Sequence, residues 1–197
     1  MPRILVIFAH PALHKSQANQ RLLAAIEGLP GITIRDLYQR YPNGFIDALA
    51  EQALLKEYDI LVFQHPFYWY SAPALLKEWM DLVLTRGYVY AETPDERLSI
   101  SRFLSVITSG GSMASYQPHG YNRFSIRQFL LPFEQTATLC GMEYLPPFVV
   151  DSVNKQGDDA RLADFAKRYR QLLEQLRDGQ LTLPEHCYYL SHPDWED

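Results

Sequence analysis

Residues 4–8 read ILVIF, and residues 9–19, which follow directly, read AHPALHKSQAN. An unbroken apolar run of this kind is typical of a strand that is buried on both faces of a parallel sheet. Ser16 is a good helix N-cap, and apolar residues recur at helical spacing from Leu22 to Ile26. This segment therefore predicts a strand, a polar loop and a helix that covers the sheet.

The same alternation continues along the chain. Further apolar runs predict strands at 32–34, 60–63, 103–107 and 144–150, the last one split by two prolines. Helices are expected between them and after them, at 16–26, from Asp47, from Ser71, at 127–139 and at 159–176. Asp47 would cap a helix with Leu49 and Leu54 on its apolar side, and Ser71 would cap the next helix. Strands that alternate with helices predict a parallel sheet covered on both faces, with right-handed crossovers.

Composition narrows the class of protein. The chain has 197 residues with 47% apolar side chains, enough to bury a core, so disorder is excluded and about one domain is expected. The net charge of −5 argues against broad nucleic-acid binding. No apolar stretch approaches the roughly 18 residues of a membrane span, and the two cysteines cannot form a disulfide framework, so a cytoplasmic protein is expected. We expect a domain at 1–178 and a tail at 179–197 that lies on the surface or on a partner.

Ligands of open parallel sheets bind at the carboxyl ends of the strands, so the loops there are the candidate site. The first loop ends at the N-terminus of a helix, which offers free N–H groups and partial positive charge to a phosphate, and His10, Ser16 and Asn19 add side-chain donors. An ordinary capped turn is the alternative. Neither a P-loop nor G-x-G-x-x-G occurs, which argues against an ATPase and a dinucleotide site of the usual type.

The second and third loops suggest a flat ligand. Four successive aromatics, Phe67 to Tyr70, could stack on a ring, although a buried aromatic corner is the alternative. Gly110 and Gly111 would let the backbone approach a ligand closely, or form a plain turn. Tyr116 and His119 follow on a loop long enough to fold over the site, although a surface histidine is common. Together the loops predict a mononucleotide with a large flat ring, and FMN is the natural candidate.

Three segments carry a family resemblance. AHP at 9–11 with SQAN at 16–19, QHP at 64–66 through WYSAPALLKEW at 69–79, and TSGG at 108–111 resemble the signatures of the flavodoxin-like NAD(P)H:quinone oxidoreductases. Within that family the chain is most similar to ancillary subunits of glutathione-gated, Kef-type potassium efflux systems, through DLY at 36–38, YP at 41–42, RG at 86–87 and LPP at 145–147. The resemblance covers roughly residues 3–175, whereas the tail from Gln180 has no recognised counterpart.

The resemblance implies an α/β flavodoxin-like three-layer fold with a five-stranded parallel sheet in the order 2-1-3-4-5. It also implies FMN, with FAD as the other option, a homodimer, and ping-pong hydride transfer from NADH or NADPH to a quinone. By position, the phosphate arm would be held by His10, Ser16, Gln17, Ala18 and Asn19. The ring would be flanked by Phe67, Tyr68, Trp69 and Tyr70, and its polar edge contacted by Thr108, Ser109, Gly110 and Gly111. Tyr116 and His119 would polarise or protonate the quinone.

Two departures from the family pattern matter. The family's Gly-Lys pair before the fourth strand is missing from residues 88–101, which predicts a different surface loop there. The family's tyrosine position falls near Ala114, and Tyr116 is two residues later. The spacing of His186, Cys187 and His192 matches no common zinc site, so no metal is expected.

Two other functions stay open. The chain could be a regulatory subunit on the cytoplasmic face of a potassium efflux antiporter, with redox chemistry secondary. It could also be a one-electron carrier like flavodoxin itself, although such carriers are usually more acidic and lack the aromatic run. The sequence does not decide the electron acceptor, the nicotinamide preference or FMN against FAD.

Overall fold

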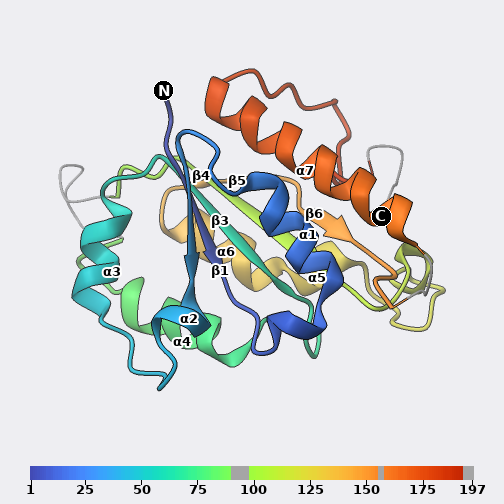
Figure 1. Ribbon diagram of the computed structural model, residues 1–197, viewed down its shortest axis with the longest axis horizontal. Coiled ribbons are helices and arrows are strands. Elements are labelled where there is room, and N and C mark those ends of the chain that lie inside the picture. The colour runs from blue at the N-terminus through green and yellow to red at the C-terminus, as the bar shows by residue number, and fades with distance from the viewer. Residues whose placement is uncertain (90–97, 155–157, 193–197) are drawn as a thin grey trace.

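A computed structural model describes residues 1–89, 98–154 and 158–192, in which strands alternate with helices (Figure 1). The strands form one parallel sheet in the order β2-β1-β3-β4-β5, and β6 also pairs with β4. This confirms the flavodoxin-like order. The strands are β1 (Ile4–Phe8), β2 (Ile32–Asp36), β3 (Ile60–Pro66), β4 (Arg102–Thr108), β5 (Glu143–Tyr144) and β6 (Phe148–Val150).

The last two strands share one edge of the sheet. β5 pairs with the first two residues of β4, and β6 pairs with its last three, from Val106 to Thr108. Pro146 and Pro147 lie between β5 and β6 and have no N–H to donate to a ladder. The predicted split of this strand therefore has a direct cause.

Helices cover both faces of the sheet. On one face lie α1 (Gln17–Ile26) and α7 (Asp159–Asp178), side by side in Figure 1. On the other face lie α2 (Leu37–Arg40), α3 (Ala48–Leu55), α4 (Ala74–Val83), α5 (Ile126–Phe129) and α6 (Leu131–Leu139). The side chains of β1 alternate between the two cores, since Ile4 and Val6 belong to the α1/α7 core and Leu5 and Ile7 to the other. All of them are fully buried, as an unbroken apolar strand requires.

Three helix predictions need correction. The single helix predicted at 127–139 is two helices that meet at Leu130, because Pro132 has no N–H and cannot continue the ladder. Ser71 does not cap α4, whose N-cap position is taken by Pro73. Asp47 does cap α3 by accepting from the Ala50 N–H. The predicted apolar side is right for Leu54, which packs against the core, but wrong for Leu49, which is 78% exposed.

The buried residues of α3 are Leu55 and Glu51. Glu51 is the unexpected one. Its carboxylate accepts hydrogen bonds from the Tyr41 hydroxyl (2.6 Å), the Trp79 indole (2.9 Å) and the Arg35 guanidinium (3.0 Å from Nε). A buried carboxylate is tolerated when its oxygens are satisfied in this way. These contacts decide which side of α3 faces the sheet.

The tail after α7 returns along the β6 edge of the sheet. The Leu190 N–H donates to the Pro147 carbonyl (3.0 Å), and the Val149 N–H donates to the Ser191 hydroxyl (2.7 Å). Tyr189 is fully buried. The loop expected around 88–101 lies in large part outside the described residues, as do the last residues of the tail. No helix in the described part of the chain has the length and apolar character needed to cross a membrane.

Candidate functional site

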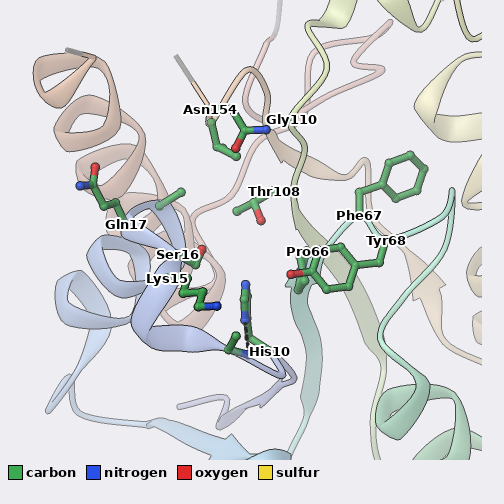
Figure 2. A pocket seen from close by; sticks show the side chains of 13 residues that line it. His10, Lys15, Ser16, Gln17, Pro66, Phe67, Tyr68, Thr108, Gly110 and Asn154 are labelled. Atoms are coloured by element: carbon green, nitrogen blue, oxygen red, sulfur yellow. Dashed lines mark hydrogen bonds between the residues drawn. The ribbon is translucent and has the colours of Figure 1, made fainter. Parts of the chain in front are cut away.

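The carboxyl ends of β1, β3 and β4 surround a cavity of about 380 Å³, within the range of small-molecule sites (Figure 2). Many of the predicted site residues line it. These are His10, Ser16, Gln17, Ala18, Phe67, Tyr68, Thr108 and Gly110. The cavity therefore lies where the three sequence segments were expected to converge.

The start of α1 forms one end of the cavity. The Ser16 hydroxyl accepts a hydrogen bond from the Asn19 N–H (3.3 Å), which caps the helix. The first-turn N–H groups of Gln17 and Ala18 have no acceptor within the helix, and both residues line the cavity. This end of the cavity thus offers donors and the positive end of the helix dipole to an anion.

His10 lines the cavity together with the N-terminus of α1 and is a neutral hydrogen-bond donor. The Ala12 N–H donates to its Nδ1 (3.0 Å), so the ring proton is assigned to Nε2. Burial lowers the pKa of His10 below 6.5, although the charge of Asp36 opposes the shift. His10 can therefore offer its Nε2–H at neutral pH without carrying charge.

Asn19 lies beneath the cavity and does not line it. The side chain is fully buried, and its amide donates to the Ser16 hydroxyl (3.0 Å) and the Thr108 hydroxyl (2.9 Å). Its carbonyl oxygen accepts from the Gln64 amide (3.3 Å), and Gln64 in turn accepts from the Tyr169 hydroxyl (3.1 Å). Asn19 thus ties α1 to β3 and β4, and through Gln64 to α7.

The loop after β3 forms the aromatic end of the cavity. Phe67 and Tyr68 line it, whereas Trp69 is 93% exposed and Tyr70 is half-exposed. Trp69 and Tyr70 are the central residues of a tight turn, closed by a hydrogen bond from the Ser71 N–H to the Tyr68 carbonyl (3.0 Å). Their φ angles are 51° and 63°, a conformation that is costly for large side chains.

The loop after β4 contributes the remaining predicted residues. Thr108 and Gly110 line the cavity, whereas Ser109 and Gly111 do not. A Cβ on Gly110 would lie 2.6 Å from the Asn154 amide nitrogen, and a Cβ on Gly111 would lie 2.9 Å from the Ser115 hydroxyl. A side chain at either position would therefore require the Asn154 or the Ser115 side chain to move.

The two residues expected to deliver protons are not among those that line the cavity. Tyr116 is buried, its hydroxyl lies 3.1 Å from the Ser109 hydroxyl, and its ring packs against Phe67 at 5.7 Å between centroids. His119 is exposed on the loop that follows. Of the pair, only Tyr116 is tied to the loop after β4 by a hydrogen bond in the described structure.

Five residues that line the cavity were not among the predicted site residues, namely Ala12, Lys15, Pro66, Val153 and Asn154. Val153 and Asn154 follow β6, and the same rule that directed attention to the other strand ends could have found them. Lys15 lies in the loop after the first strand. A lysine directly before a helix N-cap could have indicated an anion-binding position there.

The loop after β6 is held in place by Asp151. Its carboxylate accepts from the Met113 N–H (3.2 Å) and the Ser152 hydroxyl (2.9 Å), and it pairs with the Arg161 guanidinium. Burial alone would raise the pKa of Asp151, but His192, Ser152, Arg161 and Met113 together lower it to about 2. This clamp joins the loops after β4 and β6, which both contribute to the cavity.

Comparison with known proteins agrees with this arrangement. A family model described as flavodoxin-like fold matches residues 2–173. A curated relative, the glutathione-regulated potassium-efflux system ancillary protein KefG of Yersinia enterocolitica, is 42% identical over 88% of this chain and 93% of its own. The family-model match ends within α7, before the tail.

Solved structures with the same fold carry more than one functional description. General stress protein 14 of Treponema denticola, in complex with FMN, is 31% identical over 91% of this chain and all of its own, with a TM-score of 0.77. An NADPH-quinone reductase from P. pentosaceus is 30% identical over 86% of this chain and 96% of its own, with a TM-score of 0.73. A crystal structure described as a thermophilic tryptophan halogenase from Streptomycin violaceusniger contains a chain that is 38% identical, over 86% of this chain and 97% of that one, with a TM-score of 0.81.

Proposed function

The chain belongs to the flavodoxin-like family whose model spans residues 2–173, and from this premise we propose that it is an FMN-dependent NAD(P)H:quinone oxidoreductase. One observation carries the proposal, namely a single cavity with an anion seat at one end and an aromatic wall at the other. The FMN complex and the quinone reductase among the similar structures support the choice of ligand and of reaction.

The residues present fit the cofactor. The first-turn N–H groups of α1 and the Nε2–H of His10 suit a phosphate, and Phe67 and Tyr68 suit the flat face of a ring. Gly110 lines the cavity and has no side chain, so the backbone itself faces the cavity there. When bound, FMN would supply the two-electron chemistry between a reduced nicotinamide and a quinone.

The chain's own residues would then position the reactants and provide protons. Thr108 offers its hydroxyl at the cavity wall, and Ser109 positions the loop behind it. We assign the polarisation or protonation of the quinone oxygens to Tyr116 and His119. In this assignment the Tyr116 hydroxyl exchanges its partner Ser109 for the substrate.

We also propose a homodimer. Trp69, Tyr121 and Phe124 are 93%, 89% and 52% exposed, and Phe124 and Tyr70 both contact the ring of Phe129. Exposed aromatics such as Tyr70 and Phe124, which gather around Phe129, are typical of an interface. A second copy covering this patch would complete the aromatic end of the site.

Purified protein incubated with FMN and separated from free flavin tests the proposal. We expect the protein to stay yellow and to oxidise NADH or NADPH when 1,4-benzoquinone is added, with the parallel double-reciprocal lines of a ping-pong reaction. Tyr68→Ala should weaken flavin binding, whereas Phe45→Ala, at an exposed site that does not line the cavity, should not. A protein that stays colourless in excess FMN would refute the proposal.

The similarity to KefG favours a second candidate function. The relative's name describes an ancillary protein of a potassium-efflux system, and the match extends over 93% of its length. In this alternative the chain binds the inner face of such an efflux protein, and turnover is secondary. Co-purification with the water-exposed domain of the antiporter, and altered potassium efflux in cells lacking the chain, would support it. Full turnover without any such binding would favour the enzyme.

A further inference from the structure

Lys15 is the only Lys, Arg, Asp or Glu among the described residues that line the cavity. It ends the 3-10 turn Leu13–Lys15, directly before the helix cap Ser16. The turn is fixed by hydrogen bonds from the Lys15 N–H to the Ala12 carbonyl (2.9 Å) and from the Ser16 N–H to the Leu13 carbonyl (2.9 Å). Figure 2 shows the side chain reaching from the start of α1 toward His10.

No carboxylate compensates this charge in the part of the chain that the structure describes. Lys15 forms no ion pair there. Asp36, whose charge acts on His10, accepts from the Gln39 N–H (3.1 Å) as the cap of α2. The other donors at this end, the His10 ring and the N–H groups of α1, are formally neutral. A full positive charge beside a helix N-terminus favours a ligand with a full negative charge.

The net charge of the whole chain makes this local cation more important. At −5 the protein repels anions at long range, so an anionic ligand gains attraction only from groups close to it. A phosphomonoester carries about −1.5 to −2 near neutral pH. Removing the phosphate would leave Lys15 with no charge to neutralise in the cavity.

We propose that Lys15 determines specificity for a ligand with a terminal phosphate, and so selects the phosphorylated flavin over the unphosphorylated one. The proposal rests on the proposed flavin function and adds a residue and a selection rule to it. Uncharged donors bind a hydroxyl as well as a phosphate oxygen. The ammonium of Lys15, in contrast, distinguishes the charged phosphate from the uncharged hydroxyl. Binding of the phosphorylated ligand should therefore weaken as salt is added, and binding of the other should not.

Dissociation constants for FMN and riboflavin, measured by flavin fluorescence at low and high sodium chloride, test this. Lys15→Met should weaken FMN binding about tenfold at low salt and remove most of its salt dependence, as expected for one charge-assisted contact. Riboflavin binding should change by less than about twofold, and Lys15→Arg should restore most of the FMN affinity. Lys167→Met is the matched control, since it removes the same charge from an exposed position on α7.

The outcomes separate the two proposals. If the unaltered protein binds neither flavin, the proposed function fails and the selection rule fails with it. If it binds FMN but Lys15→Met leaves FMN affinity unchanged, or lowers FMN and riboflavin affinity equally, only the role of Lys15 is overturned. An equal loss in Lys167→Met would also overturn it, because the effect would then come from net charge. Circular dichroism of each variant checks that the fold is kept.

Discussion

The two ends of the cavity are built in opposite ways. At the α1 end, Asn19 is fully buried and its hydrogen bonds to Ser16, Thr108 and Gln64 join α1, β4 and β3. At the aromatic end, Trp69 is 93% exposed and lies with Tyr70 in a turn with positive φ angles. The first end is rigid before any ligand arrives, and the second retains strain and exposed surface. We infer that the phosphate seat is preorganised, whereas the ring site is completed by what binds there.

Asn19→Leu should give the largest effect on stability. The substitution leaves the Thr108 hydroxyl and the Gln64 amide without their buried partner. We expect the free energy of unfolding to fall by about 2–3 kcal/mol in urea titrations. Flavin affinity should fall as well, because Ser16 loses the contact that orients it.

The aromatic end supplies the control for this experiment. Trp69→Ala removes a larger side chain, but one that is 93% exposed, so the free energy of unfolding should change by less than about 0.5 kcal/mol. A loss in Trp69→Ala equal to that in Asn19→Leu would show that the two ends contribute alike to stability, and the comparison would be wrong.

Acid should weaken the clamp between the loops after β4 and β6 through Asp151. Its folded pKa is about 2, below the unfolded value of 3.8, so its contribution is present above pH 4 and lost as pH falls from about 4 to about 2. We expect this contribution to be about 1–2 kcal/mol, seen as a steeper acid loss of stability. The turn of Trp69 and Tyr70 contains no carboxylate, so it should not contribute to the pH dependence of stability in this range.

Asp151→Asn provides the check on that assignment. It should lower stability at neutral pH, because the amide cannot pair with the charge of Arg161, and it should flatten the curve between pH 4 and pH 2. An unchanged acid profile in Asp151→Asn would assign the transition to other carboxylates.

The fold could be predicted because its signals are local. Residues 4–8 identify a doubly buried strand without knowledge of any distant residue, and the loops that converge follow from the parallel sheet. The strand order came from the family resemblance and could not be read from the apolar runs. Leu49 was placed wrongly on the apolar side of α3, because the buried side of this helix includes Glu51, whose partners, such as Trp79, lie far along the chain.

The residues of the site also fall into two groups, those that local signals predict and those that depend on distant partners. Ser16 could be predicted as a cap because its partner is three residues away. The burial of Asn19 depends on Thr108, 89 residues further on, so the sequence could not separate a supporting residue from a lining one. The positive φ of Trp69 and Tyr70 was equally hidden, since these angles normally mark glycine or asparagine. The conformational preferences of Trp69 and Tyr70 oppose these φ angles, so contacts with distant parts of the chain must stabilise the turn.

That turn allows the last and smallest test. Trp69→Gly removes the ring and also the steric penalty at φ 51°, whereas Trp69→Ala removes the ring and keeps the penalty. The glycine variant should therefore be more stable than the alanine variant by about 0.5–1 kcal/mol in urea titrations, although glycine also gains entropy in the unfolded chain. Both variants should lose quinone turnover to the same extent if the ring, and not the strain, serves the reaction. A glycine variant that is less stable than the alanine variant would mean that the turn is unstrained, and the contrast between the two ends would then rest on exposure alone.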